Sequence, residues 1–232
     1  PVLTQLLPSG IGPEGAVAIP ERGLFVTSNE VDLIEDGGIR AHVMIYELQD
    51  GEPAYPTLVS GNQPDGRPIG WGAISGMVAD EGGIVWAVSD SFYGYQPRIF
   101  VIDTNVTPAQ IVEAIDVTRA GYPAQKLDLE GITLDGDGGF WLASEGRADR
   151  LVPHALYHVN ADGEIEDEIG LPMELEAVKK RFGFEGITKV GDTLWMAVQR
   201  EWADDPEHHV KLVAYNTETE EWGAVRYNKA TP

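Results

Sequence analysis

One short pattern recurs four times along the chain, and this repeat limits the fold more than any other feature of the sequence. Each copy begins with a glutamate or serine before glycine, which we call the anchor pair: Glu14-Gly15, Ser75-Gly76, Glu130-Gly131 and Glu185-Gly186. Successive anchors lie 61, 55 and 55 residues apart. An aromatic residue follows the anchor by 11 residues in three copies and by 10 in the last: Phe25, Trp86, Trp141 and Trp195. A sequence period of this length indicates a repeat architecture.

Each copy contains four short segments in which apolar and polar residues alternate, and the copies span approximately residues 12–60, 73–118, 128–172 and 183–228. In the first copy, the fourth segment is YPTLVS at residues 55–60. Four short strands in a unit of about fifty residues are typical of a β-propeller blade. The sequence therefore predicts an all-β fold, a β-propeller with four recognisable four-stranded blades.

The residues outside these copies predict a larger ring. The opening PVLTQLLPS has the pattern of a last strand whose own blade is absent, and an incomplete ring would expose sheet edges. We expect residues 1–232 to form a single propeller domain, or a fragment of a ring of about five to seven blades that the missing remainder closes. A short helix is predicted over residues 172–182, where Leu175, Val178 and Phe182 have helical spacing.

Propeller geometry predicts where oxygen ligands gather. The first strand of a blade begins, and the antiparallel second strand ends, at the same rim, so the anchors should meet the residues that lie four positions after the aromatics. This places six candidate metal ligands at one rim: Glu14, Asn29, Asp90, Glu130, Glu145 and Glu185. Such carboxylates repel one another unless they are protonated, paired or bound to a cation. Oxygen ligands favour Ca²⁺, with Mg²⁺ or Mn²⁺ as alternatives. The alternative is that each anchor glutamate only accepts backbone hydrogen bonds from the next blade.

The stretch DLEGITLDGDGGFWLASEG, residues 128–146, holds five acidic residues but only two predicted site residues. Its DGDG run at 135–138 aligns with turns in the other copies and is predicted to be a hairpin turn, not a cation-binding loop. Only Glu130 and Glu145, at the ends of the two strands, are predicted to belong to the site. Basic side chains should lie on loops of the same rim: Arg98, Arg147, Arg150, His154, Lys179, Lys180, Arg181, Arg200, His208 and His209. The alternative is that these are ordinary loop residues paired with acidic neighbours.

Composition excludes several classes of function. The sequence has 16 basic and 38 acidic residues, a net charge of −22, which repels nucleic acid and anionic membranes. It contains no cysteine, which excludes a thiolate nucleophile and a cysteine-based zinc site. No uninterrupted apolar run approaches the length of a membrane span. We therefore expect neither nucleic acid nor membrane as a partner.

Three segments together resemble one known family: KLDLEGITLDGDGGFWLASEG, PHALYHVNADGEI and GFEGITKVGDTLWMAVQRE. They are similar to the phytase-like family, described as "esterase-like activity of phytase", with related glutamate-glycine words in calcium-dependent lactonase and gluconolactonase propellers. The resemblance implies a secreted or periplasmic propeller with phosphoester-hydrolase activity. By motif, it also implies that Glu130, Glu145 and Glu185 are site residues, with Arg147 and Arg200 beside them.

The leading hypothesis is a secreted, Ca²⁺-dependent hydrolase of a small anionic phosphoester. Its predicted catalytic residues are Glu130, Glu185, Arg147, Arg200 and His154. A second hypothesis is a calcium-dependent lactonase or esterase that acts on a carboxylate ester at the same ring, with a carboxylate or His154 as base. A third is a non-catalytic propeller that binds a ligand or protein on that face.

Overall fold

The computed structural model describes residues 7–36, 38, 40–51, 57–90, 96–147 and 150–229 of an all-β chain. These residues belong to two compact units, Pro1–Pro56 and Thr57–Pro232, and each unit is described by itself. Across the described ranges, no helix is long and apolar enough to cross a membrane. Most of the predicted first strand, residues 1–6 of PVLTQLLPS, lies outside the described residues.

The first unit contains one antiparallel sheet. Its strands are β1 (Pro13–Ile19), β2 (Leu24–Asn29) and β3 (His42–Glu47), hydrogen-bonded in that order. A 3-10 turn, η1 (Pro20–Arg22), joins the first two strands, and a second one, η2 (Ile34–Asp36), lies in the connection to β3. These strands coincide with the first three predicted segments of the first copy.

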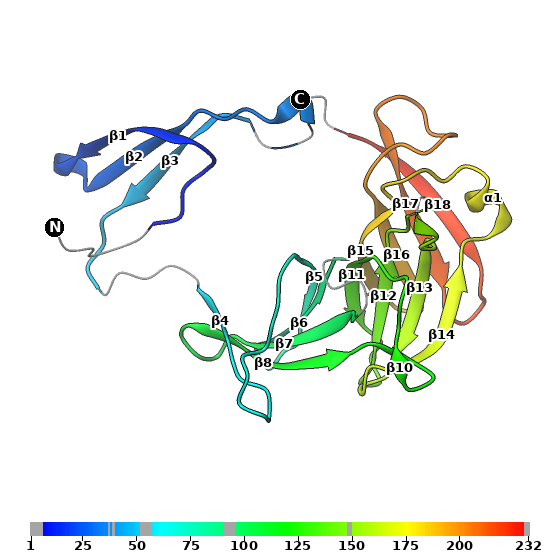
Figure 1. Ribbon diagram of the computed structural model, residues 1–232. Helices are drawn as coiled ribbons and strands as arrows, with labels where there is room; N and C mark the ends of the chain where they lie inside the picture. Colours follow the sequence, from blue (N-terminus) through cyan, green and yellow to red (C-terminus); the bar gives the residue numbers. More distant parts are fainter. Residues whose placement is uncertain are drawn as a thin grey trace. The chain divides into compact units, whose positions relative to one another are not determined.

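The second unit is built from three sheets in which consecutive strands pair antiparallel (Figure 1). The first contains β5 (Ile74–Ala79), β6 (Ile84–Ser89), β7 (Arg98–Asp103) and β8 (Ala109–Asp116). The second contains β11 (Leu129–Leu134), β12 (Phe140–Ser144), β13 (Ala155–Val159) and β14 (Ile165–Gly170). The third contains β15 (Phe184–Val190), β16 (Thr193–Val198), β17 (His209–Asn216) and β18 (Trp222–Asn228). A small hairpin, β9 (Thr118–Arg119) with β10 (Tyr122–Pro123), links the first sheet to the second.

The prediction that residues 55–60 form the fourth strand of the first copy's own sheet is wrong. Strand β4 (Leu58–Ser60) pairs in parallel with β8 and adds a fifth strand to the β5–β8 sheet. The outer edge of β8 supplies the backbone partners, and Leu58 packs against the apolar core of that sheet. Residues 52–56 lie outside the described part, and they include Tyr55 and Pro56 of the predicted strand YPTLVS.

The predicted helix over residues 172–182 is much shorter than expected. Helix α1 spans Met173–Glu176 and is followed by a turn. The carbonyl of Val178 accepts a hydrogen bond from the backbone N–H of Ala203 at 2.9 Å, which ties this segment to the β16–β17 loop. Phe182 then adopts a left-handed backbone with φ 68°, a conformation that cannot continue a helix.

The predicted hairpin turn at 135–138 is confirmed. It joins β11 to β12, and the carboxylate of Asp135 accepts hydrogen bonds from the backbone N–H groups of Asp137 at 2.7 Å and Gly139 at 2.9 Å. The imidazole of His158 lies 3.0 Å from the same carboxylate. These bonds hold the pKa of Asp135 below its usual value despite burial. The acid therefore closes a turn, as the repeat alignment indicates.

Apolar side chains pack between neighbouring sheets of the second unit. One core brings Val88 and Ile99 of the first sheet against Leu129 and Tyr157 of the second. Another brings Trp141 of the second sheet against Phe184, Met196 and other residues of the third. Because the core lies between the sheets, each sheet needs a neighbour on its apolar face.

The first strands β5, β11 and β15 lie side by side, and the anchor glycines make this approach close (Figure 1). A Cβ atom on Gly76 would lie 2.6 Å from the Cα of Gly131, and one on Gly131 would lie 2.9 Å from the backbone nitrogen of Ile187. A Cβ on Gly186 would meet no described atom within 4 Å. The anchor glycine is thus required where another first strand follows.

This difference predicts opposite outcomes for two matched substitutions. Gly131→Ala should lower the free energy of unfolding by about 2–3 kcal/mol, because the added methyl meets backbone atoms that cannot rotate away. Gly186→Ala, at the equivalent position of the next repeat, should change it by no more than about 0.5 kcal/mol. Urea denaturation of both variants measures the effect. Equal losses in the two would show that the close approach of β11 to β15 is not what requires glycine.

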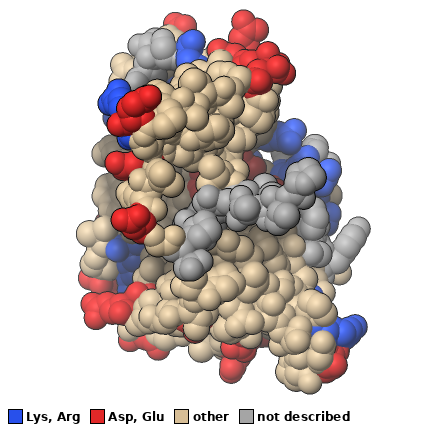
Figure 2. All heavy atoms as spheres, turned by 90° about the vertical axis from the view of Figure 1, so that its left-hand side faces the viewer, with Lys and Arg blue, Asp and Glu red and all other residues tan. Residues whose placement is uncertain are grey.

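Acidic side chains appear at several separate places on the face shown in Figure 2, with fewer basic ones among them. Many basic groups of the described residues are paired with carboxylates, as Arg67 is with Asp65 and Arg119 with Glu168. Exposed pairs of this kind contribute little stability.

Candidate functional site

Every anchor lies in an irregularity of its hairpin. The pairing register shifts between Pro13 and Gly15, between Ile74 and Met77, between Leu129 and Gly131, and between Phe184 and Gly186. A β-bulge places an extra residue on one strand and changes the direction of its side chain. The bulges therefore set the direction of Ser75, Glu130 and Glu185 at the start of β5, β11 and β15.

The ends of the second strands return to the same positions. The backbone N–H groups of Asp90, Glu145 and Gln199 donate to the carbonyls of Ala73, Asp128 and Gly183 at 3.0, 2.8 and 2.9 Å. Each acceptor lies two residues before an anchor. In the second unit, the start of each first strand and the end of each second strand thus meet, as the sequence predicts.

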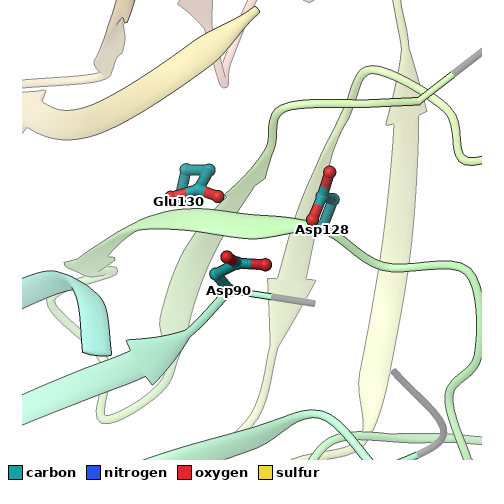
Figure 3. Close-up of side chains that lie close together, drawn as sticks. All are labelled: Asp90, Asp128 and Glu130. Carbon is teal, nitrogen blue, oxygen red and sulfur yellow. The ribbon is translucent and has the colours of Figure 1, made fainter. Parts of the chain in front are cut away.

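Three carboxylates gather at this edge of the second unit (Figure 3). One carboxylate oxygen from each of Asp90, Asp128 and Glu130 lies within 4.8 Å of the other two. Asp90 directly follows β6, Asp128 directly precedes β11, and Glu130 lies at the start of β11. The hydroxyl of Ser75, from the start of β5, donates to Glu130. We call these three acids and their neighbours Glu145 and Glu185 the carboxylate cluster.

Glu130 is a carboxyl group that favours its protonated form. Burial, followed by the charges of Glu185, Asp90 and Asp128, raises its pKa from 4.5 to about 7, while the Ser75 hydrogen bond opposes the shift. A carboxyl group with a pKa near neutrality can exchange a proton at physiological pH. It is also a group that an added positive charge would convert to the carboxylate.

Glu145 and Glu185 extend the cluster. Burial raises the pKa of Glu145 to about 7, and the charges of Glu185, Asp128 and Glu130 add to the effect. A side-chain hydrogen bond between Glu145 and Glu185 contributes to the raised pKa of Glu145, and the pKa of Glu185 is also raised, chiefly by burial. Glu145 is 8% exposed, and its Oε1 has no hydrogen-bond partner among the described atoms. The two acids therefore interact beside a buried oxygen that has no described hydrogen-bond partner.

Sequence reasoning missed Asp128. The other repeats carry Gly12, Ala73 and Gly183 at its position, so the repeat gives no signal there. Asp128 is 2% exposed, and its backbone N–H donates to the hydroxyl of Ser144 at 3.2 Å. The available signal was its spacing of only two residues from Glu130, which keeps the two acids close together where the strand begins.

His154 lies beside this edge in a buried site. The imidazole is 3% exposed, and a Cβ on Gly146 or Gly183 would come within 2.5 Å of its ring. The ring of Trp202 meets it edge-on at 5.9 Å between centroids. Burial, with help from Lys179, lowers the pKa of His154 to about 4, so it is neutral at pH 7. Within the described part of the chain, its Nδ1 has no hydrogen-bond partner.

The two predicted arginines lie at neighbouring hairpin ends. Arg147 follows Glu145 by two residues, and its backbone forms a pair of hydrogen bonds with Val152. Arg200 follows β16, and its guanidinium carbon lies 4.1 Å from the centre of the Phe182 ring. Both residues therefore belong to the loops that follow second strands.

Two predicted ligands belong to the first unit and are described there alone. Asn29 ends β2, is 2% exposed and donates from its Nδ2 to the carbonyl of His42 at 3.4 Å. Its Oδ1 meets no partner among the described atoms. Glu14 is exposed. Their membership of one ring with the carboxylate cluster stays a prediction.

Fold and site define an all-β protein of antiparallel sheets with a partly buried group of carboxylates where first strands begin. Residues 69–232 match the model of the phytase-like family, described as "esterase-like activity of phytase". The chain belongs to this family, as its motifs indicate. The match suggests a hydrolase-type β-propeller. No curated protein matches the sequence.

The solved structures that are distantly similar include the following two. An exo-β-1,3-galactanase from Phanerochaete chrysosporium, solved with β-1,3-galactotriose, has 12% identity and a TM-score of 0.44, and the match covers 74% of this chain and 42% of that one. Hydrazine synthase from Kuenenia stuttgartiensis has 12% identity and a TM-score of 0.38, with coverages of 93% and 54%. The chain thus spans about half the length of these structures.

Proposed function

We propose that this chain is part of a β-propeller that hydrolyses small anionic phosphoesters with a bound cation, Ca²⁺ in preference to Mg²⁺ or Mn²⁺. The family match supports the reaction class, and the repeated sheets with adjacent first strands support the propeller. Such a protein would be secreted or periplasmic, as the resemblance implies. Neither nucleic acid nor membrane is proposed as a partner.

The carboxylate cluster is the observation that carries this proposal. Calcium binds oxygen at about 2.3–2.6 Å, so two ligands of one ion are at most about 5 Å apart. The 4.8 Å limit among the oxygens of Asp90, Asp128 and Glu130 fits that requirement. The buried Oε1 of Glu145 offers a fourth acceptor without a donor. These four residues would hold the cation, and Glu185 would complete the group.

The proposed reaction divides its proton transfers between the glutamates. When bound, the cation polarises phosphoryl oxygens and makes water more acidic. Glu130 takes a proton from the attacking water as its oxygen bonds to phosphorus. The phosphorus–ester oxygen bond breaks, and Glu185, whose pKa is raised, would give its proton to the leaving oxygen. Arg147 and Arg200 offset the negative charge of the transition state.

His154 favours a second candidate, a calcium-dependent lactonase or esterase. Its neutral imidazole, with an unpartnered Nδ1, could act as the base on a carboxylate ester. The same carboxylate cluster would hold the cation. This reaction shares the cation dependence of the first but differs in the bond that is broken.

The decisive experiment measures hydrolysis by the full chain after removal of metal and on return of Ca²⁺. Wild type should release phosphate from p-nitrophenyl phosphate only with the cation, and Glu185→Gln should lower the rate at least about a hundredfold, because it removes the group that would protonate the leaving oxygen. Glu81→Gln is the matched control, since Glu81 is an exposed residue in the β5–β6 turn at the other end of the hairpin. It should hydrolyse at the wild-type rate.

Other outcomes separate the candidates. Cation-dependent turnover of a lactone or aryl acetate without phosphate release would favour the esterase. A protein that binds Ca²⁺ stoichiometrically but turns over none of these substrates would indicate a non-catalytic binding propeller. If Glu130→Gln and Glu185→Gln leave both calcium content and hydrolysis unchanged, the proposed site is wrong.

A further inference from the structure

Phe182 is held in a strained conformation just before β15. Its φ of 68° lies in the left-handed region, which is unfavourable for a bulky side chain. The left-handed conformation falls on Phe182 and not on Gly183, the next residue, which would adopt it without strain. Strained residues persist where the surrounding structure fixes them, and they concentrate at functional sites. The contacts of the Phe182 ring show what this conformation positions.

The guanidinium groups of two arginines lie over the Phe182 ring. The guanidinium carbon of Arg181 lies 4.8 Å from the ring centre, and that of Arg200 lies 4.1 Å from it. A guanidinium that stacks on a ring uses its face, and the N–H groups in its plane stay available to an anion. We call these three residues the arginine clamp.

The clamp is not neutralised by the acidic chain around it. Both arginines are exposed, and neither forms an ion pair with a carboxylate in the described ranges of the chain. By contrast, Arg67, Arg119 and Arg226 each pair with an acidic residue. Two guanidinium groups without a carboxylate partner therefore lie over one aromatic ring in a protein with a net charge of −22.

The pairing of β15 with β16 puts the clamp at the same hairpin end as the carboxylate cluster. Phe184 pairs with Val198, and the backbone N–H of Gln199 donates to the carbonyl of Gly183 at 2.9 Å. Phe182 directly precedes Gly183, and Arg200 directly follows Gln199. Both residues therefore lie just beyond this hydrogen bond, one on each strand side of the hairpin. Glu185 of the cluster lies only three residues after Phe182.

We propose that Arg181 and Arg200, positioned by Phe182, bind a phosphate dianion of the substrate. Two guanidinium groups match a double negative charge, and their planar donor edges suit phosphate oxygens. This inference rests on the proposed phosphoester hydrolysis and assigns it a binding site outside the carboxylate cluster. Arg181 and Phe182 have no part in the cation site or in the proton transfers.

The test titrates inorganic phosphate into the full chain by calorimetry, at low and constant ionic strength with metal chelated. Arg181→Gln and Arg200→Gln should each weaken phosphate binding about tenfold or more, because each loses a charge-assisted contact. Lysine at either position should restore part of the affinity, since it keeps the charge without the planar donor edge. Arg67→Gln, with the same change of charge at an exposed ion pair, should bind like wild type.

Phe182→Leu provides a test that leaves both charges in place. It should weaken phosphate binding, since the ring that positions the guanidinium groups is lost. Wild-type affinity in Phe182→Leu and in both glutamine variants, or no phosphate binding by wild type, would overturn the clamp. Equal affinity for acetate and phosphate would overturn the assignment to a dianion.

The outcomes also separate this inference from the proposed function. Phosphate binding is measured without metal, so Glu130→Gln should leave it in place while removing cation-dependent hydrolysis. Loss of phosphate binding in the arginine variants, in a protein with no hydrolytic activity, supports the clamp and contradicts only the proposed reaction. Calcium-dependent hydrolysis with unchanged phosphate affinity in those variants contradicts only the clamp.

Discussion

Replacement of Glu130 by glutamine is expected to raise the melting temperature of the metal-free protein above pH 7 and, in the same molecule, to abolish cation-dependent hydrolysis. Burial and neighbouring negative charges raise the pKa of this carboxyl from 4.5 to about 7 in the folded chain. The folded state therefore holds the proton more tightly than the unfolded state does. Glutamine has the shape of the protonated form and still offers an oxygen to the hydroxyl of Ser75.

The sign of the pH dependence follows from the same shift. As pH rises from 4.5 through about 7, the unfolded state releases the proton first, so the folded state loses stability over that window. Glu145, with a pKa also raised to about 7, acts in the same direction. Metal-free wild type should thus melt at lower temperature as pH rises through this range, and Glu130→Gln should show a weaker decline.

Thermal melts with chelator and with Ca²⁺ across this pH range measure both effects. Calcium should raise the melting temperature of wild type most above pH 7, where it binds carboxylates without displacing protons, and should leave Glu130→Gln nearly unaffected. Glu81→Gln supplies the matched loss of one charge. A lower melting temperature for metal-free Glu130→Gln than for wild type above pH 7 would show that this acid is stabilising, which contradicts the like-charge cluster.

The second large effect is expected from Lys211→Ala. Lys211 is 1% exposed, and its Nζ pairs with Asp204 and Asp205 in the β16–β17 loop. The side chain of Asp205 is fully buried, and Arg226 pairs with it at 2.8 Å. Removal of Lys211 leaves Arg226 as the remaining cation for both Asp204 and Asp205, so we expect a loss of about 3 kcal/mol, the lower end of the cost of breaking a buried ion pair. Urea denaturation should show this loss.

The effect should extend to the site, because the same loop carries functional groups. The carboxylate of Asp205 accepts a hydrogen bond from the backbone N–H of Trp202 at 2.8 Å, and Trp202 packs against His154. Arg200 of the arginine clamp lies two residues before Trp202 in this loop. We therefore expect Lys211→Ala to weaken phosphate binding at the clamp even where the protein stays folded. Arg67→Ala, which breaks an exposed pair with Asp65, is the control and should barely change stability. Equal stability of the two variants would contradict the buried network.

Much of the local structure could be predicted because strands follow from alternation. The segment RIFVID at 98–103 coincides with β7, and WGAVRYN at 222–228 coincides with β18. The helix over residues 172–182 could not be predicted in the same way. Its apolar spacing is helical, but a hydrogen bond from Ala203 to Val178 and the left-handed Phe182 end it early. Contacts distant in sequence decided that outcome.

The candidate site was predictable to the extent that it repeats. Glu130, Glu145 and Asp90 occupy repeat positions, whereas Asp128 occupies a position that is glycine or alanine elsewhere. The pairing of β4 with β8 also escaped the repeat, because an open sheet edge accepts a strand of either direction. Neither feature has a periodic signal in the sequence.

By itself, the sequence determined the antiparallel sheets, their order and the end of each hairpin at which acids lie, because period-two alternation and a repeated anchor specify strands and turns. Only the tertiary structure decided which acids meet, how their pKa values change, and where the two arginines of the clamp lie. Those properties depend on burial and on distances of a few ångströms between residues of different sheets and loops. No spacing along the chain encodes such distances.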